Sequence, residues 1–358
     1  MENKNNESIE NTENSTENIE STEYTESVET TENTENTENT EPAKGGHDLG
    51  TGSIGKLMLK MAIPTIIAQI INMLYDVVDR MYIGHIPDVG GIALTGVGVT
   101  FPIIVIITAF SALVGMGGAP RAAISMGQGD NKTAEKIMGN CLTTLVIIAV
   151  ILTVLTLIFA EPFILMFGGN RDTTLSYGMS YIRIYALGTI FVQCVMGMNV
   201  FITTQGFSKI SMMTTLIGAV INVILDPIFI FVLDMGVRGA AIATVLSQAV
   251  GAIWVLRFLT GKKTILKLKL SNMKLDPKVF GPCLALGISS FVMISTESLL
   301  SISFTSSLAR YGGDVAVGAM TIITSVNQLI TMPLQGICQG GQPIISYNFG
   351  AGNKDRVK

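Results

Sequence analysis

Residues 138–160 read MGNCLTTLVIIAVILTVLTLIFA, a run of 23 residues without a single Asp, Glu, Lys or Arg. A helix needs about 20 predominantly apolar residues to cross the hydrocarbon core of a bilayer. In that core the backbone must satisfy its own hydrogen bonds, and a helix does so within one segment. The run therefore predicts an all-α membrane protein rather than a soluble domain.

Seven further apolar runs accompany it, separated by short polar or glycine-containing segments such as 85–91 and 310–314. The additional runs lie at 58–84, 92–115, 181–204, 210–233, 239–259, 279–309 and 315–338. Each is long enough to cross a bilayer. We therefore predict a polytopic protein with eight membrane spans.

The charges divide the chain into two unlike parts. Residues 1–50 hold 14 of the 27 acidic and two of the 23 basic residues, so they carry −12 and the remaining 308 residues carry +8. Residues 1–48 consist mostly of Glu, Asn, Thr and Ser, and offer too few apolar side chains to offset their ordering entropy. We predict a disordered acidic N-terminal tail and no cleavable signal peptide, since no apolar run follows a basic start.

The Lys and Arg residues predict the orientation. With eight spans, 18 of the 23 fall on the side that holds the N-terminus and five on the other. Basic residues are enriched on the cytoplasmic side, so both ends are expected there, in a plasma-membrane protein. The basic loop 262–278 is the longest internal connection; it is either a topogenic linker or a contact with lipid headgroups.

An internal repeat has a constant offset of 223 residues. Gly117-Gly118-Ala119-Pro120 corresponds to Gly340-Gly341-Gln342-Pro343, and Gly127 and Gly129 correspond to Gly350 and Gly352. Six spans separate the copies, so the repeats run parallel. We predict one complete six-helix lobe at 49–261, a linker at 262–278 and the first two helices of a second lobe at 279–358. Twelve spans are then implied, and we expect a C-terminally truncated sequence.

Ionisable side chains inside spans indicate function, because burying them is costly. Asn222 and Asp226 are four residues apart, on one helix face directly before Pro227. If their helix meets those of Asp79 and Thr244, the four side chains form an oxygen-rich cluster suited to a proton or to Na⁺. The alternative is that Asp226 only hydrogen-bonds a kink at Pro227.

Two further acidic residues are candidates. Asp76 lies three residues before Asp79 and shares its helix face. Glu297 lies in the polar stretch 294–298, either as a second group for an ion or a cationic substrate, or as a protonated carboxyl bonded to nearby serines.

Several motifs together resemble the multidrug and toxic compound extrusion (MATE) family of transporters. The resemblance covers residues 49–358 and excludes the tail. Its motifs are Leu49-Gly50-Thr51 to Leu57, Ala62-Ile63-Pro64-Thr65, Tyr75-Asp76-Val77-Val78-Asp79, Tyr82-Ile83-Gly84, Gly127-Gln128-Gly129-Asp130, Gly236-Val237-Arg238-Gly239-Ala240-Ala241-Ile242-Ala243-Thr244, and the stretch from Gln342-Pro343 to Gly350-Ala351-Gly352.

The resemblance implies a fold of two six-helix lobes that alternates between inward-open and outward-open states. It implies antiport of cationic, amphipathic drugs against protons or sodium. By position, Asp79 resembles the acidic switch of the first helix, and Asn222, Asp226 and Thr244 the rest of an ion site, with Ala240 as a backbone-carbonyl ligand. The register of Glu297 does not match the family's second acidic site.

Two other function classes compete with this interpretation. A flippase for lipid-linked saccharides of the same superfamily would require several buried Arg or Lys residues, whereas the spans hold mainly carboxylates. A membrane enzyme lacks support, because the two histidines, His47 and His85, have no metal-ligand neighbours and no nucleophile stands beside a base. We expect no enzyme activity, no cofactor beyond the coupling ion, no nucleic-acid partner and a monomer in contact with membrane lipid.

Overall fold

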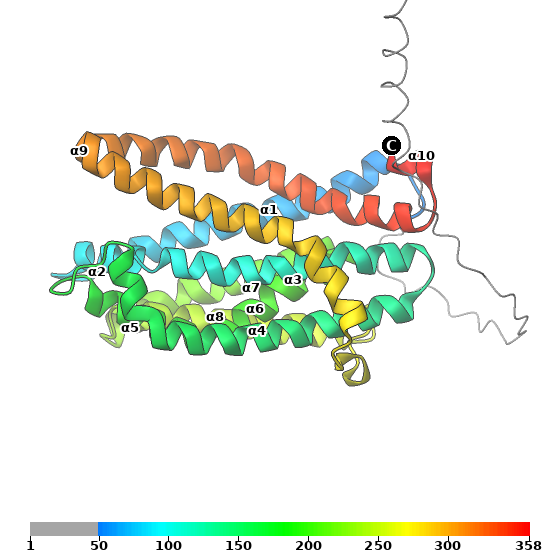
Figure 1. Ribbon diagram of the computed structural model, residues 1–358, viewed down its shortest axis with the longest axis horizontal. Coiled ribbons are helices and arrows are strands. Elements are labelled where there is room, and N and C mark those ends of the chain that lie inside the picture. Colours follow the sequence, from blue (N-terminus) through cyan, green and yellow to red (C-terminus); the bar gives the residue numbers. More distant parts are fainter. Residues whose placement is uncertain (1–48) are drawn as a thin grey trace, which may run out of the picture. The chain divides into compact units, whose positions relative to one another are not determined.

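The computed structural model describes residues 49–358; within this range the side chains at 302, 305–306, 308–310, 312–319, 321–322, 325 and 329 are not described. The predicted disordered tail, 1–48, lies outside the described residues. The described chain is helical, and its longer elements lie roughly side by side (Figure 1). The elements are α1 (Ile54–Gly84), α2 (Gly90–Gly98), α3 (Phe101–Gly127), α4 (Asn131–Met166), α5 (Leu175–Leu187), α6 (Thr189–Thr204), α7 (Ser208–Pro227), the π-helix η1 (Ile228–Val232), α8 (Val237–Leu259), the 3₁₀-helix η2 (Leu270–Met273), α9 (Pro277–Gly350) and α10 (Lys354–Val357).

Six described helical segments are long and apolar enough to cross a membrane, and α5 with α6 makes a seventh if this pair, bent by 58°, is one span. The all-α membrane fold predicted from the sequence is therefore confirmed. Part of the predicted eighth run, 315–338, consists of residues whose side chains are not described.

Two predicted spans have different boundaries in the structure. The run 92–115 is divided at Val99 and Thr100 into the short α2 and the long α3, which continues to Gly127. The run 181–204 is broken at Gly188 between α5 and α6. Hydropathy remains high through both breaks, so apolarity alone did not reveal them.

Helix α9 doubles back along its length. A Cβ atom on Gly117 of α3 would meet the backbone of Cys283, and one on Gly127 would meet that of Tyr347. A straight helix would separate Cys283 from Tyr347 by roughly 96 Å, whereas Gly117 and Gly127 are only about 15 Å apart along α3. The two limbs of α9 therefore run out and back, as Figure 1 shows. The segment 310–314, which separates two apolar runs in the sequence, belongs to α9 and has a helical backbone.

Contacts between the helices follow the repeat offset. Gly127 meets the carbonyl of Tyr347, and Gly350 meets the carbonyl of Ile124, so each contact becomes the other when 223 is added or subtracted. Gly117 packs on the first limb of α9, and its equivalent Gly340 packs on the backbone of α1. Helix α3 and the second limb of α9 thus pack against each other as a pseudo-symmetric pair.

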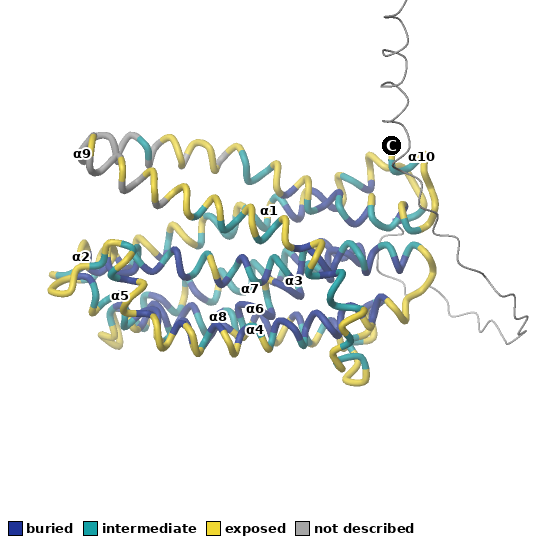
Figure 2. The backbone as a smooth tube through the Cα atoms, viewed as in Figure 1, coloured by how far each residue is buried: buried dark blue, intermediate teal, exposed yellow. Residues whose placement is uncertain are grey.

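Burial is greatest among α3, α4, α6 and α8 and decreases along α9 away from α10 (Figure 2). The largest cluster of buried apolar residues includes Met138, Leu145, Met198 and Phe201. Exposed apolar residues remain numerous on the outer faces of α4 and α9. Such exposure is expected where lipid takes the place of water.

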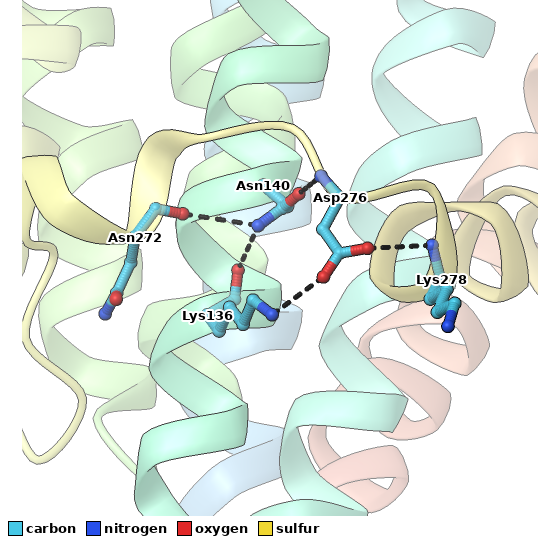
Figure 3. Close-up of polar contacts among 5 residues, drawn as sticks. All are labelled: Lys136, Asn140, Asn272, Asp276 and Lys278. Atoms are coloured by element: carbon cyan, nitrogen blue, oxygen red, sulfur yellow. Dashed lines mark hydrogen bonds and ion pairs between the residues drawn. The ribbon is translucent and has the colours of Figure 1, made fainter.

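The connection between α8 and α9 is hydrogen-bonded to the side of α4. The buried amide of Asn140 donates to the carbonyls of Lys136 (2.9 Å) and Asn272 (3.2 Å), and its oxygen accepts from the backbone N–H of Asp276 at 2.7 Å (Figure 3). Lys136 Nζ pairs with Asp276 Oδ2 at 2.7 Å. We call residues 262–278 the linker, and the contacts that α4 makes with them the linker latch.

A carboxylate of α4 also holds the linker in place. The buried Glu135 accepts the backbone N–H of Lys267 at 2.9 Å and the ammonium of Lys269 at 2.7 Å. Asp276 also caps α9 by accepting the backbone N–H of Lys278. Its bond with Lys136, and after that its bond with the N–H of Lys278, lower the pKa of Asp276 below its usual range.

Candidate functional site

A buried polar cluster lies where α1, α7 and α8 meet. Asn222 and Asp226 of α7 are fully buried, and Thr244 of α8 is nearly so. The amide nitrogen of Asn222 donates to Asp226 Oδ1 at 3.2 Å and to Thr244 Oγ1 at 3.4 Å. The structure thus brings together three of the side chains that the sequence singled out.

Asp79 enters the cluster from α1. It is buried, and its carboxyl group contacts that of Asp226. Ala240, near the start of α8, is also fully buried. We call Asp79, Asn222, Asp226 and Thr244 the acidic cluster.

The acidic cluster contains more acceptors than donors. Asp79 Oδ1, Asn222 Oδ1 and Asp226 Oδ2 are each buried and without a hydrogen-bond partner among the described residues. A buried carboxylate is unfavourable unless a hydrogen bond, a proton or a cation compensates it. Three unbonded oxygens beside two carboxyl groups are the arrangement that a proton or a hard cation would complete.

Local sequence explains how α7 and α8 come together. Pro227 lacks an N–H and interrupts the hydrogen bonding of α7, and the chain continues as the π-helix η1. Such irregular turns occur frequently at functional sites. Gly239 of α8 lies against the backbone of Phe229 in η1, where a Cβ atom would approach to 2.6 Å. Glycine at this position therefore allows the close approach that places Ala240 and Thr244 beside α7.

Two tyrosines that were not among the predicted site residues belong to the surroundings of the cluster. The side chains of Tyr75 on α1 and Tyr181 on α5 both contact Thr244. The ring of Tyr181 also stacks on that of Tyr185, with centroids 6.1 Å apart. Tyr75 could have been found, because it lies four residues before Asp79 on the same face. Tyr181 could not, because only the folded chain brings α5 to this place.

The other acidic candidates lie outside the cluster. Asp76 and Glu297 are both exposed, the former on α1 and the latter on the first limb of α9. Among the described residues Glu297 makes no hydrogen bond or ion pair, including none to the nearby serines. Arg80 is also exposed, and its guanidinium carbon lies 4.3 Å from the ring centre of Phe101. Arg80 therefore makes a cation–π contact with Phe101.

A pocket of about 700 Å³ contains none of the residues of the acidic cluster in its lining. It is lined by residues that follow the end of α1, by residues of α5 and by residues at the start of α8, including Asp88, Asp234 and Arg238. Asp88 and Asp234 have positive φ angles of 63° and 51°. None of the predicted site residues lines this pocket.

Comparison with known proteins gives one family. The MatE family model matches residues 64–228 and 289–358, which include Asp79, Asn222 and Asp226. A multidrug export protein, MepA of Staphylococcus haemolyticus (strain JCSC1435), is 27% identical over 306 residues, covering 86% of this chain and 67% of the relative. The chain spans about two thirds of the length of the curated relatives it matches.

Solved structures have the same fold. A transporter of the MOP superfamily from Pyrococcus furiosus Vc1 (DSM3638), described as having a binding pocket of reverse polarity, superposes with a TM-score of 0.81 at 23% identity. An outward-facing multidrug resistance MATE family transporter gives the same score and identity. Both matches cover 88% of this chain and 70% of the matched chain.

Proposed function

Because the chain belongs to the MatE family of membrane transporters, we propose that it is an ion-coupled antiporter that exports cationic, amphipathic drugs by alternating access. The observation that carries the proposal is the set of three unbonded oxygens in the acidic cluster. A bound H⁺ or Na⁺ would supply the missing partner. The naming of the relatives as multidrug export proteins supports the choice of substrate class.

The proposed coupling uses α1 as a connecting element. Near its start, the hydroxyl of Thr65 donates to the carbonyl of Gly336 in the second limb of α9, at 2.6 Å. Near its end, Asp79 reaches the acidic cluster. The two sites are roughly 21 Å apart along the helix. An ion bound by Asp79 and Asp226 would draw the end of α1 toward α7 and α8, and α1 would carry the change to α9.

Exchange then follows from differential affinity. Ion binding neutralises the carboxylates in one state and removes the charge that attracts a cationic drug, so the two ligands favour different states. We propose Asp79, Asn222, Asp226 and Thr244 as the ligands, with Ala240 contributing its carbonyl. Asp76 is a secondary candidate on the same helix face. We place the protein in the plasma membrane as a monomer surrounded by lipid, with the N-terminus in the cytoplasm.

The proposal is tested with the protein reconstituted in proteoliposomes and loaded with a fluorescent cationic dye. An imposed pH gradient and an imposed Na⁺ gradient are compared at equal membrane potential. We expect one of the two gradients to drive dye movement in the wild type. We expect this movement to be lost in Asp79→Asn and in Asp226→Asn. Equal dye movement in both variants and the wild type would refute the site. Movement with neither gradient in the wild type would refute ion coupling.

A further inference from the structure

The linker presents a fixed basic surface. Residues 262–278 contain six lysines and one acidic residue, Asp276, and all six lysine side chains are exposed. Lys269 is paired with Glu135. The other five make no ion pair among the described residues, although Lys278 faces Asp276 from farther away. They are Lys262, Lys263, Lys267, Lys274 and Lys278.

The latch holds this surface at a definite level on the helix bundle. Thr143 donates to the carbonyl of Met273 at 2.7 Å, and Gly139 lies against the backbone of Asn272. These residues stand at the start of the uncharged run 138–160, eight to twelve residues inside α4, which begins at Asn131. Because Glu135 and Lys136 also contact the linker, only the first turn of α4, residues 131–134, extends beyond it. The linker therefore lies beside the helices, where the uncharged run 138–160 begins, and not beyond their ends.

Apolar side chains lie among the lysines. Leu270 is 87% exposed and Leu275 is 39% exposed, although both belong to a segment that the latch holds in place. Exposed leucines beside lysines are unfavourable in water but typical of segments that lie in a membrane interface. An acidic soluble partner would account for the lysines, but it would leave the exposure of Leu270 unexplained.

A small hollow at the same place suits a headgroup. It has a volume of about 380 Å³ and is lined by Lys136, Ser271, Asn272, Lys274 and Asp276, among others. Lys136 balances the charge of Asp276, and the ammonium group of Lys274 and the hydroxyl of Ser271 are suitable partners for a phosphate. We propose that the linker is a binding site for an anionic phospholipid, with the phosphate at Lys274 and the side chain of Leu270 at the acyl-chain boundary.

The test places a reporter at the tip of the linker. Trp254 is the only tryptophan of the chain, so Trp254→Phe with Leu270→Trp gives a single fluorophore at position 270. The protein is reconstituted in vesicles in which either phosphatidylglycerol or phosphatidylcholine is brominated, at constant lipid composition. We expect quenching by both lipids, with an apparent affinity about fivefold higher for phosphatidylglycerol.

Charge variants test whether the lipid preference depends on the linker lysines or on any basic residues of the chain. Replacing the five unpaired linker lysines with Gln should reduce the ratio of the apparent affinities for phosphatidylglycerol and phosphatidylcholine to about one. A matched variant with Gln at Lys56, Lys60, Lys209, Lys354 and Lys358 should retain it. Replacement of the linker lysines with Arg keeps the charge and should also keep the preference, which guards against a folding defect in the Gln variant.

Three outcomes would overturn the proposal. Absence of quenching by either lipid would place residue 270 outside the bilayer. An unchanged preference in the linker Gln variant would exclude these lysines. Loss of the preference in millimolar glycerol phosphate would assign the hollow to soluble phosphate instead of lipid.

Discussion

The acidic cluster and the linker latch use the same residue types in opposite ways. Asn140 and Asn222 are both fully buried, yet the side chain of Asn140 has all its polar atoms bonded, whereas the oxygen of Asn222 has no described partner. Asp276 accepts from Lys136 and from a backbone N–H, whereas Asp226 contacts another carboxyl group. A complete network stabilises a fold, and an incomplete one indicates a missing ligand.

The largest effect is expected in the acidic cluster. Asp226→Asn removes a charge and an acceptor that the proposed ion requires, so ion-driven dye efflux should fall at least about 100-fold. Expression and thermal stability should be retained, because the substitution also removes a buried carboxylate that has no cation beside it. Efflux is measured in proteoliposomes and stability in detergent. A large loss of stability without loss of efflux would assign Asp226 a structural role.

The two buried asparagines give a matched comparison of stability. Asn140→Ala leaves the N–H of Asp276 and the carbonyl of Asn272 without partners and should lower the free energy of unfolding by about 3 kcal/mol. Asn222→Ala loses only two long contacts and should cost about 1 kcal/mol or less. Denaturation of both variants by heat or SDS ranks them. Equal costs, or the reverse order, would contradict the distinction between the networks.

Glu135 should be of intermediate importance to the latch. Glu135→Gln keeps the size of the side chain but loses the ion pair with Lys269, and it should reduce stability by about 1 kcal/mol. Hydrogen exchange of the linker amides near Lys267 should rise while efflux stays near the wild-type rate. An increase in hydrogen exchange that is confined to the amides of α4 would show that Glu135 does not hold the linker.

The smallest effect concerns pH at the exposed end of the latch. Because the pKa of Asp276 is lowered in the folded protein, its contribution to stability is fully present above its unfolded pKa of about 4 and is lost as the pH falls through the lowered value. Amide exchange at residues 272–278 should therefore increase only in strongly acidic solution. In Lys136→Gln the increase should begin at a higher pH, and an identical pH profile would contradict the pairing.

The sequence predicted the elements more reliably than their arrangement. Long apolar runs identified the spans because the bilayer imposes their length, and carboxylates within the spans identified Asp79 and Asp226 because burial makes them conspicuous. The break at Gly188, the reversal of α9 and the approach of Tyr181 to Thr244 depend on tertiary packing, for which hydropathy carries no signal. The latch was also missed, since Asn140 and Thr143 resemble ordinary polar positions in an apolar helix.

The acidic cluster is proposed to bind one cation or proton that its oxygens lack. The melting temperature of the purified protein tests this directly, measured against NaCl at pH 8 with choline holding ionic strength constant, and against pH without sodium. A ligand at 100 times its dissociation constant stabilises by about 2.7 kcal/mol. We predict a rise with sodium or with acidification between pH 8 and pH 6 that disappears in Asp226→Asn. A wild-type melting temperature that responds to neither, or an undiminished response in Asp226→Asn, would contradict the account.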